Sequence, residues 1–463
     1  ELVPLDEARF DAASVLAMAD VLLKGIVDDH FRERLAACDP PPQFDWDAAG
    51  TRFAEVIEAE QRILHRSRRS RRPRVAVVSP VPPEPAGPAM YAGHLFPAMA
   101  RHVDLTLFTA ALPETVELAG DIKVERLSML EQIERLGDPF DEVVYFFGNS
   151  EYHLFYPEFL KRRPGAVVLH DARLHGLYRE MARLRPDLAP GGFHETLHRM
   201  YPGRYPHDVG ASGGFDLPQL QQYGVAMVGD LAGTATTMFV HSTHAADLIE
   251  LDCGRRPDVA FPLPVPPSAH RGDGDPNLVG SFGIVAPSKA PDDLIEAVAL
   301  TSELRLVFVG PVGAEYRDVL ESLAADRRCR DRVQFTDVVS DEEYHDWLRR
   351  VGVLAQLRRT SNGESSAAAC DAIATGTPLV VTDMGAFSDL PDAVAAKVAH
   401  GATADELARH LESLALDPVR RAEMIEAQAG YAEANSYDAA AEALLVALLG
   451  ADRLRPAALA PTR

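Results

Sequence analysis

The chain contains 463 residues, of which 47% are hydrophobic and 25% are charged, and its formal net charge at neutral pH is −23. This length is too great for one hydrophobic core, so we expect two compact domains with additional material. The strongly negative balance argues against sequence-independent binding to nucleic acid, because such binding needs a basic face that neutralises phosphates.

The pattern at the amino terminus predicts a helical segment followed by a basic linker, together residues 1–72. Residues 22–35 and 44–57 have amphipathic helical periodicity, and they resemble residues 414–424 and 435–448 near the other end of the chain. We interpret residues 1–60 as the tail of a preceding, similar module, cut from a longer chain because the sequence starts at Glu1 within a helical pattern. Chance likeness between amphipathic helices is the alternative.

The only dense basic patch is the linker HRSRRSRRPR (65–74). A run of this kind fits a solvated connection between folded parts. Its alternative role is peripheral contact with anionic lipid headgroups, to which each basic residue contributes about 1 kcal/mol.

The rest of the chain alternates apolar, β-rich runs with helical patterns. This alternation predicts right-handed crossovers and parallel sheets with helices on both faces. We therefore expect an α/β protein with two doubly wound, Rossmann-like domains, joined near residues 261–267, and a ligand between them at the carboxyl ends of the strands. The predicted strands are 74–79, 103–109, 142–148, 166–171, 237–242, 277–285, 304–310, 332–338, 351–357 and 378–383.

A stretch rich in Gly, Pro and His interrupts this alternation between Arg183 and Gly233, where little periodicity is visible. Such a stretch fits a long surface excursion. Its functional interpretation is a loop over an acceptor site.

Polar and small residues follow several predicted strands of the first half. Gly87 lies in the loop after the first strand, where small residues allow backbone N–H groups to approach a phosphate or sugar oxygen, although an ordinary turn explains the glycine equally well. His170 and Asp171 end the strand 166–171, at the edge that faces the expected cleft. Further candidates for the same cleft follow the preceding strand, namely Asn149, Tyr152 and His153.

The run QLRRTSNGESSAAACDAIATG (356–376) is the most informative part of the second half. It places Arg358, Arg359 and Glu364 between a buried-type strand and an Ala-rich helix. Free N–H groups and the dipole at a helix N-terminus favour anions. The run therefore predicts a site for a phosphorylated ligand.

These pieces, in this order, resemble the retaining, nucleotide-sugar-dependent glycosyltransferases of family 4, which have the GT-B fold. The resemblance covers about residues 74–450. It implies an acceptor domain at 73–265, a donor domain at 266–432 and, at 433–463, a helix that packs back on the first domain, with a tail. The motifs that carry it are PVPPEPAGPAMYAGHL (80–95), VVYFFGNSEYH (143–153), PGAVVLHD (164–171), FGIVAPSKAPDDLIEA (282–297) and RRTSNGESSAAACDAIATGTPLVVTDMG (358–385).

The resemblance also implies roles for individual residues. Lys289 matches the family lysine that binds the donor diphosphate, but Ile284 stands where the family has an arginine, and Arg358 or Arg359 is the expected substitute. The catalytic residues implied are Glu364, His170, Lys289 and Arg358. The donor-binding residues implied are Gly87, Lys289, Arg358, Arg359, Ser365, Ser366 and Asp371.

Two of these assignments depend on the helix after the second-half run. Ser365 and Ser366 would open it, with their N–H groups and hydroxyls directed at the diphosphate. The family's second glutamate holds the nucleotide ribose; here Ala372 occupies that position, and Asp371, one residue earlier, would replace it.

We therefore expect transfer of a sugar from a GDP- or UDP-linked donor to an acceptor hydroxyl with retention of configuration, in cell-surface polysaccharide or glycoconjugate biosynthesis. This reaction requires no cofactor or metal, and the four separated cysteines have no metal-ligand spacing. We expect a cytoplasmic protein, peripheral at the inner membrane face, because the sequence has no signal-peptide pattern and no apolar run of about 20 residues. The partners expected are the donor, a saccharide or lipid-linked acceptor, and a fused upstream glycosyltransferase domain.

Two alternatives remain open at this point. One keeps the fold but changes the reaction, to a nucleotide-sugar epimerase or a phosphorylase with a lysine-bound pyridoxal cofactor. The other is a module with a degenerate donor site that binds a sugar or scaffolds another transferase, which Ile284 and the shortened spacing from Glu364 to Asp371 favour.

Overall fold

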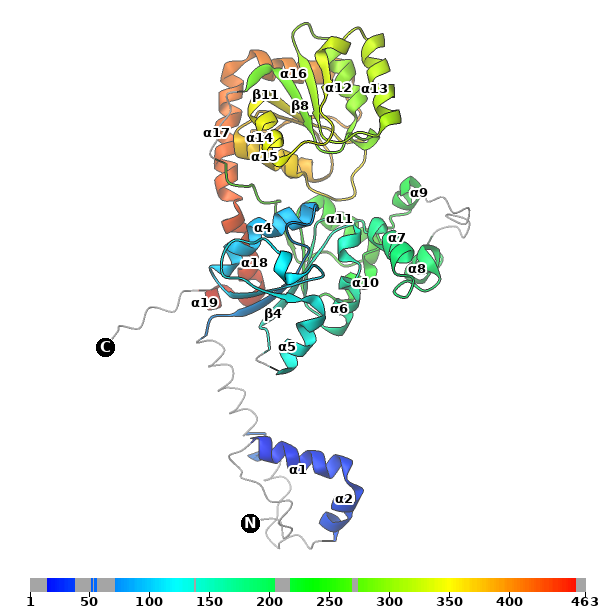
Figure 1. Cartoon of the computed structure of the whole chain (residues 1–463), viewed down its shortest axis with the longest axis vertical. Coiled ribbons are helices and arrows are strands. Elements are labelled where there is room, and N and C mark those ends of the chain that lie inside the picture. The colour runs from blue at the N-terminus through cyan, green and yellow to red at the C-terminus, as the bar shows by residue number, and fades with distance from the viewer. Residues whose placement is uncertain are drawn as a thin grey trace, which may run out of the picture. The chain divides into compact units, whose positions relative to one another are not determined.

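A computed structural model describes residues 15–37, 51–52, 54–55, 71–136, 139–204, 217–268 and 274–454. The chain divides into two compact units, residues 1–71 and residues 72–463. Figure 1 shows the elements of both. None of the helices in the described ranges combines the length and the apolar character that crossing a membrane requires.

The first unit contains a break between two helices that has a counterpart near the other end of the chain. Helix α1 (Val15–Val27) is followed at once by α2 (Asp29–Ala36), because the Asp28 carboxylate accepts a hydrogen bond from the Phe31 N–H and caps the second helix. Asp417 caps α17 (Pro418–Ala434) directly after α16 (Ala404–Leu416) in the same way. Most of residues 44–57 and 65–74 lies outside the described residues, so the rest of the predicted repeat and the basic linker stay predictions.

The second unit contains two parallel sheets with the same strand order. The first sheet, which we call the amino lobe with its helices, runs β3-β2-β1-β4-β5-β6-β7, and the sheet of the carboxyl lobe runs β10-β9-β8-β11-β12-β13. In each sheet the chain starts in the middle, moves outward and then returns past the first strand, which is the doubly wound order. The predicted strands are all present, and the short edge strands β3, β7 and β13 are additional.

The bounds of the elements follow. The strands are β1 (Arg74–Val78), β2 (Asp104–Thr109), β3 (Lys123–Arg126), β4 (Glu142–Phe147), β5 (Ala166–Leu169), β6 (Met238–Val240), β7 (Val259–Ala260), β8 (Asp275–Phe282), β9 (Arg305–Val309), β10 (Val333–Phe335), β11 (Val351–Gln356), β12 (Leu379–Thr382) and β13 (Ala396–Val398). The further helices are α4 (Gly87–Ala100), α5 (Leu130–Leu136), α6 (Tyr156–Arg162), α7 (His175–Leu184), α8 (Gly192–Met200), α9 (Leu217–Gln222), α10 (Gly229–Thr234), α11 (Thr243–Cys253), α12 (Pro291–Ala299), α13 (Ala314–Asp326), α14 (Asp341–Arg350), α15 (Ala367–Thr375), α18 (Tyr437–Leu449) and α19 (Ala451–Leu454). The short 3₁₀ turns are η2 (Pro113–Thr115), η3 (Leu127–Met129), η4 (Glu151–His153), η5 (Pro287–Lys289), η6 (Arg330–Arg332) and η7 (Gly385–Asp389).

The sequence alternation explains why both faces of each sheet are covered. Successive side chains of a strand point to opposite faces, and in β9 Leu306 and Phe308 pack in one core cluster while Val307 and Val309 pack in another. The first cluster includes apolar residues of α12, α13 and α16, and the second includes those of α14, α15 and α17. The central part of β9 is apolar without interruption because both faces of the sheet are buried.

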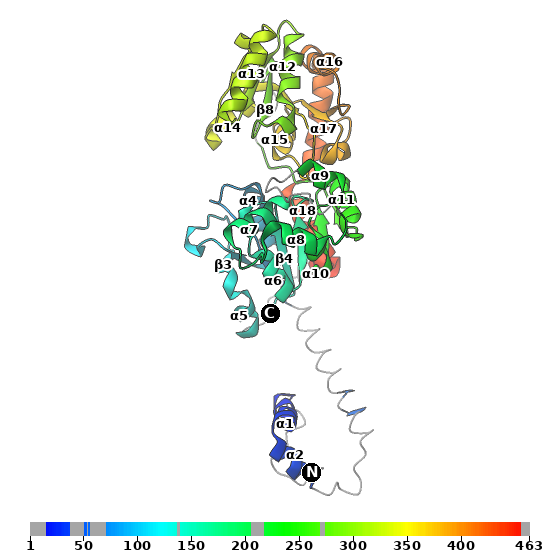
Figure 2. The same cartoon turned by 90° about the vertical axis from the view of Figure 1, so that its right-hand side faces the viewer.

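The chain returns to the amino lobe at its end. The Val265 N–H of the linker donates to the Asn435 carbonyl at 2.8 Å, and α18 then packs on α4, burying Ala441, Leu444 and Leu445 in the amino-lobe core. Figures 1 and 2 both show α18 beside α4. The two lobes are therefore joined by two crossing segments.

The stretch between Arg183 and Gly233 is not one loop. Helices α8, α9 and α10 occupy much of it, residues 205–216 lie outside the description, and Leu197 and Leu231 are fully or almost fully buried. The prediction of a long surface excursion without regular structure was therefore wrong for the described part, whereas its role over an acceptor site stays a prediction. Glycine, proline and histidine obscured helices that tertiary packing stabilises.

Candidate active site

Three of the predicted site residues lie after the carboxyl ends of two central strands, where the strand order reverses. In the carboxyl lobe Lys289 follows β8, and Arg358 and Glu364 follow its neighbour β11. In the amino lobe the loops after β1 and β4 meet in the same manner, since a Cβ on Gly148 would lie 3.0 Å from Pro88 Cγ. Open α/β sheets bind ligands at these reversal points.

Lys289, Arg358 and Glu364 form one charged cluster. The Arg358 Nε lies 3.6 Å from Glu364 Oε1, and the Lys289 ammonium lies 3.5 Å from the Phe282 carbonyl oxygen. Gly283 has a φ of +92°, and a Cβ there would come within 2.8 Å of Lys289 Nζ, so the glycine provides both the backbone conformation and the space for this lysine.

Burial changes the electrostatics of this cluster. Desolvation, helped by the positive charge of Arg358, lowers the pKa of Lys289 to about 8, although Glu364 favours the charged form. Desolvation also lowers the pKa of Arg358, whose side chain is 10% exposed. Two partly desolvated cations beside one carboxylate leave a net positive site, which suits an anionic ligand.

The two predicted arginines have different surroundings. The Arg359 guanidinium pairs with Asp292 at 2.8 Å and with Asp293 at 2.7 Å, both in the first turn of α12. These carboxylates already balance its charge, so we assign Arg358 alone to the cluster. Ile284, at the position of the family arginine, is 63% exposed and brings no charge.

Asp371 lies in the middle of α15. Its Oδ2 accepts a hydrogen bond of 2.8 Å from the Tyr344 hydroxyl, and burial raises its pKa. This carboxyl is therefore held by α14. Its binding of ribose hydroxyls stays a prediction.

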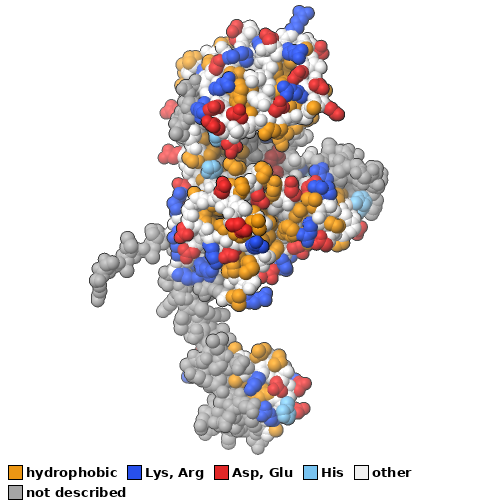
Figure 3. Space-filling view, viewed as in Figure 1, with side chains coloured by type: hydrophobic (Ala, Val, Ile, Leu, Met, Phe, Trp, Pro, Cys, Tyr) orange, Lys and Arg blue, Asp and Glu red, His pale blue; other side chains and the backbone are white. Residues whose placement is uncertain are grey.

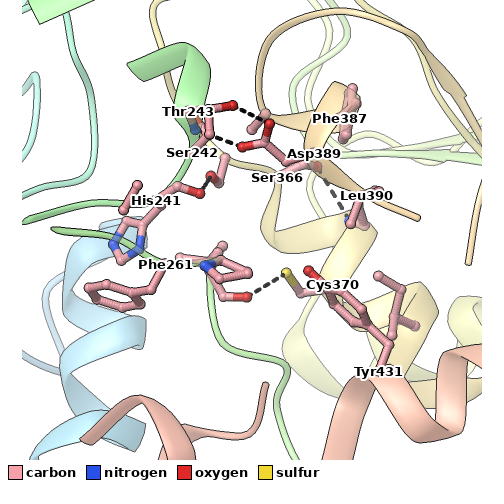
Figure 4. Close-up of a pocket in the computed structure, with 17 residues that line it drawn as sticks. His241, Ser242, Thr243, Phe261, Ser366, Cys370, Phe387, Asp389, Leu390 and Tyr431 are labelled. Atoms are coloured by element: carbon pink, nitrogen blue, oxygen red, sulfur yellow. Dashed lines mark hydrogen bonds between the residues drawn. The ribbon is translucent and has the colours of Figure 1, made fainter. Parts of the chain in front are cut away.

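Ser365 and Ser366 lie on the wall of a separate cavity of about 350 Å³ beside the linker. Figure 4 shows Ser366 at the start of α15, in a pocket that His241 and Phe261 and, from α17, Tyr431 also line. The Ser366 hydroxyl accepts a 3.3 Å hydrogen bond from the Ala369 N–H and so caps α15. Lys289, Arg358 and Glu364 do not line this cavity.

At the rim of that cavity the two lobes are in direct contact. The Asp389 carboxylate of η7 accepts a hydrogen bond of 2.7 Å from the Thr243 N–H at the start of α11, and the Thr243 hydroxyl donates to its other oxygen. A carboxylate at a helix N-terminus is favourable because it meets free N–H groups and the positive end of the dipole.

In the amino lobe, His170 belongs to a buried aromatic group. Its ring centroid lies 4.6 Å from that of Tyr91 and 5.2 Å from that of His241. Burial, together with the neighbouring His241, lowers the pKa of His170 well below 6.5, so the imidazole is neutral at pH 7. Gly87 lies at the first residue of α4, and a Cβ there would have no neighbour within 4 Å among the described residues.

The fold brings two amino-lobe residues close to Glu364, Asp171, which the sequence placed at the cleft, and Arg173, which had no assigned role. The Asp171 carboxylate accepts a 2.9 Å hydrogen bond from the Asn149 N–H, and burial, with the charge of Glu364 second, raises its pKa to about 7. Arg173 donates from Nη1 to the Ser361 carbonyl at 3.1 Å. The position of Asp171 after a strand pointed to the cleft, but Arg173 had no such signal because arginine is common after helix and strand ends.

On the face shown in Figure 3, acidic and basic side chains are interspersed over both lobes of the second unit. Among the described residues, no cluster of three or more His, Cys, Asp or Glu side chains has the arrangement of a metal site.

Comparison with protein families gives a match in the carboxyl lobe. Residues 267–430 match the family model described as glycosyl transferases group 1. The chain is 35% identical over 176 residues to a D-inositol 3-phosphate glycosyltransferase of Streptomyces avermitilis, which is 35% of this chain and 37% of the relative. It is 32% identical over 188 residues to the enzyme of that name from Xylanimonas cellulosilytica, covering 40% and 44% of the two chains. The chain thus spans less than half the length of these curated relatives.

Solved structures share the complete two-lobed arrangement. Sucrose-phosphate synthase from Thermosynechococcus elongatus superposes with a TM-score of 0.55 at 14% identity, over 81% of this chain and 97% of the other. HepE of Anabaena, solved with UDP and glucose, superposes with a TM-score of 0.52 at 14% identity, over 81% and 100% of the chains. The chain therefore has the GT-B fold, and residues 267–430 of its carboxyl lobe match the family model of the glycosyl transferases group 1.

Proposed function

We propose that this protein is a retaining glycosyltransferase that moves a sugar from a nucleoside-diphosphate sugar to an acceptor hydroxyl. The observation that carries the proposal is the cluster of Lys289, Arg358 and Glu364 at the strand reversal of the carboxyl lobe, across from Asp171 and His170 of the amino lobe. The family match of the carboxyl lobe supports the same reaction class.

The proposed donor lies with its diphosphate at the two cations. As the bond between sugar and phosphate breaks, negative charge grows on the leaving diphosphate, and Lys289 and Arg358 stabilise that charge most strongly at the transition state. Their partial burial strengthens this interaction, because the local dielectric is lower than that of water. Glu364 would accept hydrogen bonds from hydroxyls of the transferred sugar.

The proposed acceptor side is formed by His170 and Asp171. Burial keeps the His170 imidazole neutral, and Asp171, whose pKa is raised to about 7, is partly protonated near neutral pH, so both can exchange hydrogen bonds with sugar hydroxyls. In this proposal the leaving phosphate takes the proton of the acceptor hydroxyl on the same face of the sugar, which gives retention.

For the nucleotide and the acceptor we propose candidates to be tested rather than one compound. UDP is the first nucleotide to test, because the HepE structures contain UDP, glucose or UDP-glucose. WaaG, with a TM-score of 0.50, is described as involved in lipopolysaccharide biosynthesis, which is consistent with a polysaccharide or glycoconjugate role for this chain in the cytoplasm. The inositol phosphate in the names of the curated relatives is a third acceptor class to include.

The test is release of nucleoside diphosphate from UDP- and GDP-sugars, with and without acceptors of these classes, together with calorimetric titration of UDP and GDP. We expect binding of one nucleotide and acceptor-dependent release, with the product anomer, read by NMR, matching that of the donor. A scaffold with a degenerate donor site would bind neither nucleotide. An epimerase would convert donor without any acceptor.

A further inference from the structure

The turn formed by Ser361, Asn362 and Gly363 of the carboxyl lobe rests directly on the amino lobe. The Asn362 carbonyl accepts hydrogen bonds of 3.0 Å from the N–H groups of both Ala172 and Arg173. The Arg173 guanidinium completes the contact with its 3.1 Å bond to the Ser361 carbonyl. All of these bonds use the backbone of the turn, so they depend on its conformation.

Gly363 makes this close approach possible. Its φ is +80°, in the left-handed region that favours glycine. A Cβ at this position would lie 2.4 Å from the Cβ of Ala172. Any side chain would therefore push the turn away from the amino lobe.

The same turn holds the carboxylate of Glu364. The Asn362 N–H donates to Glu364 Oε2 at 2.6 Å, and the Ser361 hydroxyl lies 3.4 Å from that oxygen. Asn362 therefore contacts the amino lobe through its carbonyl and Glu364 through its N–H. Displacement of the turn would change both contacts together.

Burial of Arg173 at this contact carries an unfavourable desolvation free energy. It is 8% exposed, and desolvation lowers its pKa, while the charges of Glu364 and Asp252 favour its charged form. Its Nε has no hydrogen-bond partner among the described residues. The desolvation free energy of a buried guanidinium argues for a role beyond packing, since an apolar side chain would fill the same space without that penalty.

We propose that Arg173 and the Ser361–Gly363 turn are positioning elements that hold Glu364 in its working orientation only when the two lobes are docked. The inference rests on the glycosyltransferase function proposed above. Arg173 acts through the turn, and Glu364 is the group that meets the donor sugar. Donor binding to the cations of the carboxyl lobe alone does not require the docked turn, whereas transfer does.

The experiment compares Arg173→Ala, Arg173→Lys and Gly363→Ala with the wild-type chain. We expect kcat to fall at least tenfold in Arg173→Ala and Gly363→Ala, while the calorimetric Kd for the nucleoside diphosphate changes less than about twofold. Arg173→Lys keeps a donor for the Ser361 carbonyl and should recover part of the lost kcat. Arg183→Ala, which removes an exposed arginine of α7 with its own partner Glu180, is the matched control and should match the wild type.

The outcomes separate this inference from the proposed function. Normal kcat in Arg173→Ala and Gly363→Ala, with wild-type transfer intact, overturns the positioning role alone. A Kd that rises in parallel with the loss of kcat overturns it as well, because the turn would then support donor binding. A wild-type chain that binds no nucleotide refutes the proposed function and this inference together. Thermal unfolding of each variant identifies one that fails to fold. In that case the kcat and Kd of Arg173→Lys, the mildest change, test the positioning role: a kcat equal to that of the wild type overturns it.

Discussion

The two lobes share one strand order but present opposite chemistry at the point where that order reverses. The carboxyl lobe gathers the cations Lys289 and Arg358, whereas the amino lobe gathers groups whose charged forms desolvation disfavours: it lowers the pKa values of His153, His170 and His241 and raises that of Asp171. The comparison shows that the doubly wound topology provides a place for a ligand and that the side chains at its strand ends decide which ligand. A charged diphosphate suits one lobe and an uncharged saccharide suits the other.

The largest expected effect comes from the residue that faces both lobes. Replacing Glu364 by Gln removes the negative charge beside Arg358 and Lys289. It also weakens the hydrogen bonds that this side chain would accept from hydroxyls of the donor sugar. We expect transfer to fall by about 100-fold or more, the scale of losing one group that acts at the transition state. Steady-state release of nucleoside diphosphate measures it. Glu303→Gln, at an exposed position, is the control, and near-normal transfer by Glu364→Gln would remove this residue from the site.

The next effect distinguishes the two neighbouring arginines. Arg358→Ala should weaken nucleoside diphosphate binding by about 1.5–3 kcal/mol, the contribution of a charged hydrogen bond. Arg359→Ala should leave affinity almost unchanged, because its partners Asp292 and Asp293 lie on α12. Isothermal titration calorimetry measures the nucleoside diphosphate affinity of both variants. Equal losses would mean that the two side chains share the diphosphate.

The pH dependence of nucleotide binding tests the charge of Lys289. Its pKa in the free protein is lowered to about 8, so the ammonium that attracts the diphosphate is present below pH 8 and is lost as the pH rises above it. We expect affinity to decline from about pH 8 upward, roughly two units earlier than for an exposed lysine. Lys289→Ala should bind more weakly and lose this decline. A profile that stays flat to about pH 10, where an ordinary lysine titrates, contradicts the assignment.

The smallest expected effect concerns the neutral histidines of the amino lobe. His153 and His241 have folded-state pKa values of about 4, below the value near 6.5 of an unfolded chain. The unfolded chain therefore binds more protons between these values, and the free energy of unfolding should fall as the pH falls from about 6.5 to about 4. Urea unfolding of wild type and His241→Phe at pH 7 and pH 5 checks this. The variant should lose less stability than the wild type over that interval.

Much of the fold could be predicted from the sequence. Unbroken apolar runs such as 351–357 and 378–383 predict central parallel strands because both faces of such strands are buried. The edge strands β3, β7 and β13 were missed because β3 (KVER) and β13 (AKV) are short and carry charged residues and β7 has only two residues, so none shows the apolar run of a buried strand. The helices α8 to α10 were missed because glycines and histidines weaken local periodicity where packing supplies the stability.

The candidate site divides in the same way. Arg358 and Glu364 could be predicted because they lie between a recognisable strand and helix, and Lys289 could be predicted from the family resemblance; the three lie together in the folded chain. The separate surroundings of Arg359 could not be predicted, since only the position of α12 brings Asp292 and Asp293 to it. The contact between Arg173 and Ser361 joins residues 188 positions apart, and no local pattern encodes it.

The sequence by itself determined the class of fold, the order of the strands along the chain and the strand ends at which chemistry is concentrated, because hydrophobic periodicity and turn residues act locally. The tertiary structure alone decided which charges neutralise one another, which histidines are desolvated and where the turn at Asn362 meets the amino lobe. Burial and Coulomb interactions depend on distances in space, and those distances exist only once both lobes are packed.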